Sequence, residues 1–198
     1  EANDDFVITT GSGDDTVTFE GAAYVGHATT AGSIVISTGA GADTISVDVD
    51  TLLASTTRSV TITGGTGADA ITKTAGSTNA ADAEATFAFV VAEGDSTIAA
   101  RDVITGFNTA TTYFSDVLDF TGTAAVATTA ASNDSGTILS HSIANGIITF
   151  DDAATFGTAL VINAANLDDA TGYLALNVTT ALQTIAFGYD STGSGSAD

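Results

Sequence analysis

Residues 34–47 read Ile34-Val-Ile-Ser-Thr-Gly-Ala-Gly-Ala-Asp-Thr-Ile-Ser-Val47, and this stretch decides the fold. Apolar and small polar residues alternate on both sides of a Gly-x-Gly-x-Asp turn, which is the period of two short β-strands. Two further segments repeat the pattern, Phe6-Val-Ile-Thr-Thr-Gly-Ser-Gly-Asp-Asp-Thr-Val-Thr-Phe19 and Val60-Thr-Ile-Thr-Gly-Gly-Thr-Gly-Ala-Asp-Ala-Ile-Thr72. The chain therefore contains an internal repeat of strand, glycine turn and strand.

The spacing of the repeats predicts how they stack. The last Asp of each turn falls at Asp15, Asp43 and Asp69, at steps of 28 and 26 residues. One step fits one coil of a solenoid, with two strands, the glycine turn on one side and a variable loop on the other. We predict an all-β fold, a parallel β-roll or β-solenoid with the Gly-x-Gly-x-Asp turns stacked along one edge. The apolar residues two places after each Asp should point inward and set the register; they are Val17, Ile45 and Ile71.

The charge balance excludes several classes of partner. Three basic residues face 24 acidic ones, for a net charge of -21. No basic patch exists to neutralise phosphates, so we expect neither nucleic-acid binding nor docking on an anionic membrane. No apolar run is long enough for a membrane span. Bound divalent cations would relieve the self-repulsion, and a merely soluble or halophile-like acidic surface is the alternative explanation.

The Gly-x-Gly-x-Asp turn has a chemical interpretation of its own. Glycine permits positive φ and tight turning, so backbone carbonyls can converge on one point. The Asp side chain adds a charged oxygen, and stacked turns then form an oxygen cage suited to a hard cation. Glycine turns in a metal-free solenoid remain the alternative.

These turns resemble the repeats-in-toxin (RTX) nonapeptide, Gly-Gly-x-Gly-x-Asp-x-apolar-x, of calcium-binding proteins exported by type I secretion. Only the third repeat has both leading glycines, because Thr10 and Thr38 stand where Gly64 stands in the third. The resemblance implies calcium between successive turns, on one edge only, since the motif here recurs once per coil. The implied ligands are the turn carbonyls and carboxylates of Gly11, Gly13, Asp15, Gly39, Gly41, Asp43, Gly65, Gly67 and Asp69.

A second stretch resembles the segment that closes β-rolls in such proteins. It runs from Glu93 through Asp102-Val-Ile-Thr-Gly-Phe107 to Asp116-Val-Leu-Asp-Phe120, and the family pattern assigns Asp102 to the last calcium. We therefore divide the chain into a calcium-binding β-roll at 1–75, a closing segment at 76–120 and a β-rich carboxy-terminal region at 121–198.

The carboxy-terminal region is similar to that of Gram-negative surface-layer proteins. Its pattern predicts a hairpin at 138–150, a helix near 165–177 capped by Asn166, and a last strand at 184–189. Residues 121–136 have little pattern and are expected to form a loop. The Gly/Ser-rich tail after Ser191 is expected to be mobile.

Catalytic constellations are scarce, and we predict that the chain is not an enzyme. The two histidines, His27 and His141, lie in no metal-binding or nucleophilic motif, and each has a simpler interpretation as a surface or sheet-face residue. The acid pairs Asp151-Asp152 and 168–169 are adjacent in sequence, and the second pair suits the first turn of a helix. Glycosidase chemistry instead needs carboxylates from separate elements that face a cleft.

Three functions remain open at this level. The first is a secreted, extracellular or cell-surface structural protein that folds on calcium and assembles with itself into a surface layer or filament. The second is the export module of a secreted protease, lipase or toxin whose catalytic part lies upstream, because the chain begins inside a repeat. The third is an adhesin, and cell-surface polysaccharide is a further candidate partner.

Overall fold

A computed structural model of the chain describes residues 5–20, 33–48, 59–74, 86–91, 95–107, 116–120, 123–124, 129–144, 146–177 and 183–196. The fold is mostly β, with parallel sheets and one short helix. The chain divides into two compact units, Glu1–Thr121 and Gly122–Asp198, which are described separately below. None of the helices in the described residues is long and apolar enough to cross a membrane.

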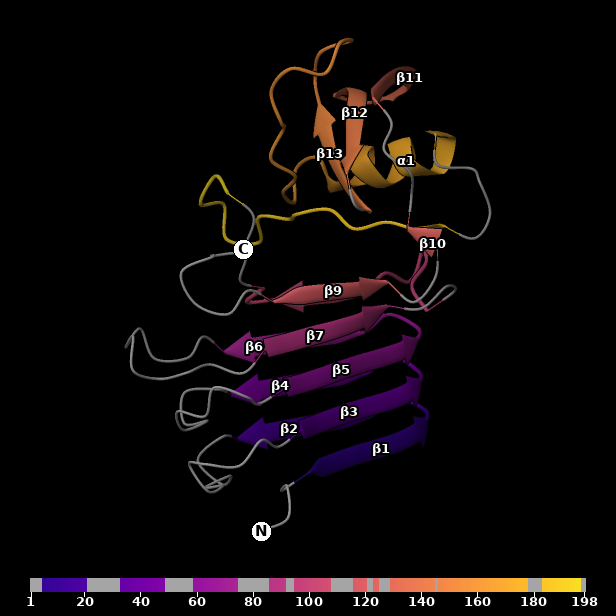
Figure 1. Ribbon diagram of the computed structural model, residues 1–198. Coiled ribbons are helices and arrows are strands. Elements are labelled where there is room, and N and C mark those ends of the chain that lie inside the picture. The colour runs from indigo at the N-terminus through magenta and orange to yellow at the C-terminus, as the bar shows by residue number, and fades with distance from the viewer. Residues whose placement is uncertain are drawn as a thin grey trace, which may run out of the picture. The chain divides into compact units, whose positions relative to one another are not determined.

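The first unit consists of two parallel sheets, and successive strands alternate between them (Figure 1). One sheet has the order β1-β3-β5-β7-β9 and the other β2-β4-β6-β8. The strands of the first sheet are β1 (Phe6–Ser12), β3 (Ser33–Ala40), β5 (Ser59–Thr66), β7 (Thr86–Val91) and β9 (Val117–Phe120). Those of the second are β2 (Thr16–Glu20), β4 (Thr44–Asp48), β6 (Ala70–Thr74) and β8 (Val103–Thr105).

The strands pair so that equivalent residues of the three repeats lie side by side. Ile8 pairs with Ile36 and Ile36 with Ile62 in the first sheet. Val17 pairs with Ile45 and Ile45 with Ile71 in the second. These three residues of the second sheet are buried, as predicted. Matching positions therefore form continuous rows, and the turns that join the strands are brought into register as well.

The core of this unit lies between the two sheets and follows from the period-2 pattern. The side chains that point inward form rows across the paired strands. These rows are aliphatic in the repeats and aromatic at both ends of the stack of strands. Phe6 and Phe19 contact each other at a ring distance of 5.7 Å at one end, and Phe87 and Phe89 lie in the row at the other. Each buried side chain of this size contributes about 1.5–3 kcal/mol relative to exposure, so the core is the main source of stability.

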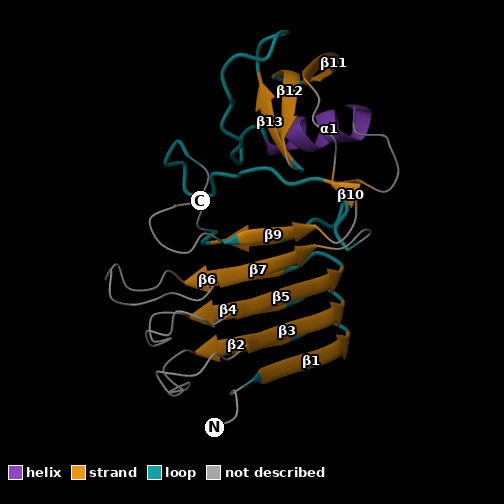
Figure 2. Ribbon diagram, in the orientation of Figure 1, coloured by secondary structure: helices purple, strands orange, loops and turns teal. Residues whose placement is uncertain are grey.

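The second unit joins an antiparallel sheet to the helix (Figure 2). The sheet has the order β11 (Thr129–Ser135), β12 (Ile138–Ala144) and β13 (Ile147–Asp151), and α1 spans Leu167–Asn177. Strands β10 (Thr123–Ala124) and β14 (Gln183–Thr184) form a short parallel pair. Tyr173, fully buried, stands at the centre of the core, with its ring edge-on to Phe150 at 6.0 Å.

Several details of this unit differ from the prediction. The segment expected to be a loop contains β10 and β11, and the expected last strand is reduced to β14 with isolated bridges at Ala186 and Asp190. Asn166 does not cap the first turn of α1; its side-chain oxygen accepts the N–H of Asn163 at 2.8 Å. In each case a contact distant in sequence, or a local side-chain bond, overrides the pattern of the segment itself.

Candidate metal site

The Gly-x-Gly-x-Asp turns stack directly on one another, and the stacking explains their glycines. Gly39 has φ of 102° and Gly65 has φ of 98°, in the region that side chains rarely adopt. A Cβ at Gly65 would collide with the carbonyl oxygen of Gly39, and a Cβ at Gly39 with that of Gly11. Gly41 and Gly67 repeat this relation two residues further along, above Gly13 and Gly41 respectively. The turn carbonyls thus point along the stack at places where only glycine fits.

The four predicted aspartates form one ladder on this edge. The backbone N–H of Asp15 donates to Oδ1 of Asp43 at 2.8 Å, and that of Asp43 to Oδ1 of Asp69 at 2.9 Å. The N–H of Asp69 donates to Oδ1 of Asp102 at 3.0 Å. Asp102 therefore continues the series from a segment that lacks the repeat motif.

Each inner carboxylate of the ladder has an oxygen that the protein does not satisfy. Asp43 and Asp69 are each 1% exposed, and Oδ2 of both is buried without a hydrogen-bond partner. Oδ2 of Asp69 lies against Gly64, at the place where a side chain of that residue would be. A buried charged oxygen without a partner is costly, so the ladder is electrostatically incomplete by itself.

Neither of the two basic side chains that the structure describes completes it. Lys73 is bound to Asp116, with Nζ at 2.7 Å from Oδ2, and this is the only ion pair within the described ranges. Arg101 donates to the carbonyl of Ile98 at 3.2 Å. Arg58, the third basic residue, lies outside the described residues.

The pKa values of Asp69 and Asp102 show that the charged form of these two carboxylates is destabilised. Burial raises the pKa of Asp69, and the charge of Asp43 and that of Asp95 raise it further against the lowering effect of the Asp43 N–H. Burial raises the pKa of Asp102 to about 6, again with contributions from neighbouring acids. Both carboxyl groups are thus less readily ionised than a free Asp, as expected for groups that are buried beside other acids.

Asp95 is a member of the site that the sequence did not single out. Its carbonyl accepts the N–H of Gly67 at 2.9 Å, which is the role that the carbonyl of Thr66 plays for Gly41. Ser96 beside it accepts the N–H of Asp102 at 2.8 Å. In the sequence, the run Gly94-Asp95-Ser96 could have pointed to this residue, but it lacks the Gly-x-Gly-x-Asp spacing of the repeats.

The arrangement restricts which ligands could hold a cation. Among the described residues, no three His, Cys, Asp or Glu side chains gather closely enough to hold a metal ion by themselves. Any cation here would need backbone carbonyls together with one or two carboxylates. The unpartnered Oδ2 atoms and the aligned turn carbonyls are such a set, made only of the oxygen ligands that hard divalent ions prefer.

The other candidates do not form a site. His27 lies outside the described residues, and His141 is buried with Nδ1 at 2.9 Å from the Tyr173 hydroxyl. Asp151, the first of an adjacent acid pair in the sequence, is buried, and its carboxylate accepts the N–H groups of Ala153, Gly157 and Thr158. It therefore organises a loop of the second unit.

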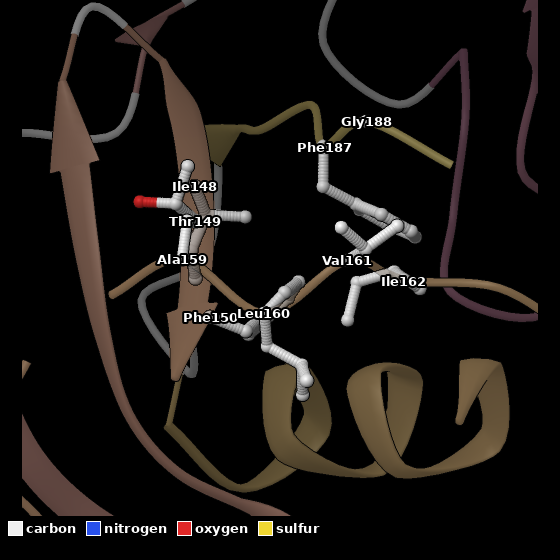
Figure 3. A pocket seen from close by; sticks show the side chains of 9 residues that line it. All are labelled: Ile148, Thr149, Phe150, Ala159, Leu160, Val161, Ile162, Phe187 and Gly188. Atoms are coloured by element: carbon white, nitrogen blue, oxygen red, sulfur yellow. The ribbon is translucent and has the colours of Figure 1, made fainter. Parts of the chain in front are cut away.

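An apolar hollow of about 160 Å³ lies in the second unit (Figure 3). The hollow is lined by Ile148, Phe150, Leu160, Ile162 and Phe187, among others, and Thr149 is the only one of the described lining residues with a polar side chain. Its oxygen points away from the other labelled side chains (Figure 3), and none of the described lining residues is titratable.

Comparison with known proteins adds no relative to this geometry. No protein-family model, curated protein or solved structure matches the chain.

Proposed function

We propose that the chain is an extracellular calcium-binding structural protein of the RTX type, whose first unit is a β-roll that folds on binding calcium. The observation that carries the proposal is the pair of buried oxygens, Oδ2 of Asp43 and Oδ2 of Asp69, that have no hydrogen-bond partner among the described residues. A divalent cation between the turns would supply the missing positive charge. Carbonyls of Gly39, Gly41 and Gly65 are candidates for the remaining ligands.

The overall charge supports a requirement for calcium. At -21, the chain repels itself in any compact state, and each bound Ca²⁺ would remove two units of that charge. Extracellular calcium modules bind at about 10⁻⁴–10⁻³ M, well above cytosolic free calcium. The chain would remain unfolded inside the cell, pass a type I export channel and fold outside.

The edge of the first sheet supports assembly. β1 has one neighbour among the described strands, β3, and its Phe6 and Val7 are 43% and 66% exposed. An edge strand with exposed apolar side chains accepts a further strand, from another copy or from more of the same chain. Self-assembly into a surface layer or filament would use such edges once calcium has lowered the repulsion.

Circular dichroism with chelator and with millimolar calcium tests the folding part of the proposal. We expect β-structure to grow on addition of calcium, and an identical spectrum in both conditions would contradict calcium-dependent folding. Light scattering and electron microscopy under the same two conditions test assembly. A calcium-folded chain that stays monomeric at high concentration would favour an export module over a structural protein.

A further inference from the structure

Lys73 and Asp116 form a buried pair that the calcium site does not use. Nζ of Lys73 lies 2.8 Å from Oδ1 and 2.7 Å from Oδ2 of Asp116. The side chains are 6% and 1% exposed. One of only three basic residues in the chain is thus enclosed together with a carboxylate.

Both residues occupy positions that belong to the apolar interior. Lys73 pairs with Val47 and Val47 with Phe19, so Lys73 continues an inward row of β2 and β4. Asp116 directly precedes β9 and is buried beside the other sheet. Nζ also lies 4.8 Å from the centre of the Phe87 ring, which adds an aromatic wall to the pair.

Stability alone is a poor explanation for this pair. Replacing a buried ion pair by apolar side chains of similar volume is often neutral or stabilising, because both charges must be desolvated. The row already contains Val47, so an apolar residue at position 73 would continue the existing packing. The pair instead holds an amine and a carboxyl group in contact, away from water, which is the arrangement that favours their condensation.

We propose that Lys73 and Asp116 react with each other to form an intramolecular isopeptide bond. One proton passes from Nζ to a carboxylate oxygen along the hydrogen bond, which removes both charges from the apolar interior. The neutral amine then attacks Cγ of Asp116. A C–N bond forms, the C–OH bond breaks, and the hydroxyl leaves with a proton from the nitrogen as water. The reaction consumes no other reagent.

The bond would fasten β6 of one sheet to the start of β9 in the other. Residues 73 and 116 are 43 positions apart, so the link would close a long loop and restrict the unfolded chain. It would form only after folding has brought the two side chains together. Such a link suits a protein that must withstand mechanical load outside the cell.

The mass of the folded wild-type chain decides the proposal. The chain is purified under denaturing conditions, refolded with calcium, and measured intact before and after refolding. We expect the refolded protein to be lighter than the sequence mass by one water. An unchanged mass in a chain whose amides are protected from exchange would overturn the proposal and leave an ordinary ion pair.

Trypsin locates the bond and separates it from a succinimide, which also loses one water. The enzyme can cut this chain after Arg58, Lys73 and Arg101 only. The amide would block cleavage after Lys73 and would join residues 59–101 to residues 102–198, even in denaturant. The matched control is Asp116→Ala, which should keep its sequence mass and release residues 59–73. Loss of water in wild type with normal cleavage after Lys73 would place the dehydration elsewhere and refute the link.

Discussion

The two units of the molecule bury carboxylates in opposite ways. In the first unit Asp43 and Asp69 each satisfy one oxygen with a backbone N–H and leave the other without a partner. In the second unit Asp151 and Asp190 are equally buried, but each accepts three backbone N–H groups of its own loop. The second unit completes these two buried charges from within, whereas the first unit leaves those of Asp43 and Asp69 incomplete.

The pKa values divide along the same line. Burial raises the pKa of Asp69 and of Asp102. Hydrogen bonds from Gly157, Ala153 and Thr158 hold the pKa of Asp151 below its ordinary value, and bonds from Gly195, Ser194 and Gly193 do the same for Asp190. A carboxylate stabilised in its charged form needs no cation, whereas one destabilised in that form does. The comparison therefore predicts that calcium acts on one unit only.

Removal of calcium should produce the largest effect and should separate the two units. With chelator, we expect amides of β3 and β5 to exchange at least about tenfold faster, because the like charges of the ladder then lack a counterion. Amides of β12 and β13 should keep their protection. Hydrogen-exchange mass spectrometry of the full chain resolves both regions in one experiment. Equal loss in both units, or loss in neither, would contradict the division.

Substitution of one ladder carboxylate should have opposite effects in the two conditions: it should weaken calcium binding, and it should stabilise the chain in chelator. Asp43→Asn keeps an oxygen for the Asp15 N–H but removes the unpartnered charge, so calcium affinity should fall about tenfold or more. In chelator the same variant should be more stable than wild type by about 1–3 kcal/mol, since it no longer buries an unpaired charge. Calorimetric titration and urea unfolding measure the two effects.

The control for this variant is Asp119→Asn, the same change at an exposed position of β9 in the same unit. It should leave both quantities nearly unchanged. Equal losses of affinity in the two variants would mean that the acids act only as diffuse charge, which would remove the structural basis of the calcium site.

The difference between the units also explains which features of each could be predicted from the sequence. In the first unit every repeat carries its own strand–turn–strand signal, and parallel stacking pairs Ile45 with Val17 and Ile71, which hold the same position in the neighbouring repeats. The ladder of Asp15, Asp43 and Asp69 could therefore be predicted from spacing alone. Its unpartnered oxygens could not, because they depend on which atom of each carboxylate faces the next turn.

In the second unit no repeat supplies such a signal. Asp151 could not be recognised as buried, because its N–H donors come from an irregular loop whose path depends on tertiary contacts. The tail after Ser191 was expected to be mobile, yet residues 193–195 fold back onto the carboxylate of Asp190. Gly and Ser in that stretch indicated flexibility, whereas they permit the tight turns that bring three N–H groups to one side chain.

Asp151→Asn tests whether the second unit is indeed self-sufficient. The amide keeps one acceptor oxygen but replaces the other by a donor, which faces either the N–H of Ala153 or the N–H groups of both Gly157 and Thr158. We expect the unfolding temperature of the second unit to fall by several degrees, with or without calcium. Differential scanning calorimetry in chelator and in calcium measures this loss. Asp168→Asn, at an exposed position in the first turn of α1, should cause a smaller loss, and rescue of Asp151→Asn by calcium would contradict the comparison.

The smallest effect expected is a weak pH dependence of the second unit. Burial against Tyr173 lowers the pKa of His141 below its ordinary value of 6.5, so the folded unit holds this ring neutral. The unfolded chain takes up the proton first as pH falls through about 6.5, and stability is therefore lost from that pH down to the lower folded pKa. The carboxylates of Asp151 and Asp190 add a separate loss only at more acidic pH, because their folded pKa values are depressed. We expect exchange of β12 amides to accelerate modestly between about pH 7 and pH 5 in wild type, after correction for the intrinsic rate, and His141→Gln to abolish that slope. A slope that persists in His141→Gln would assign the effect to the acidic first unit, whose repulsion also changes as its aspartates take up protons.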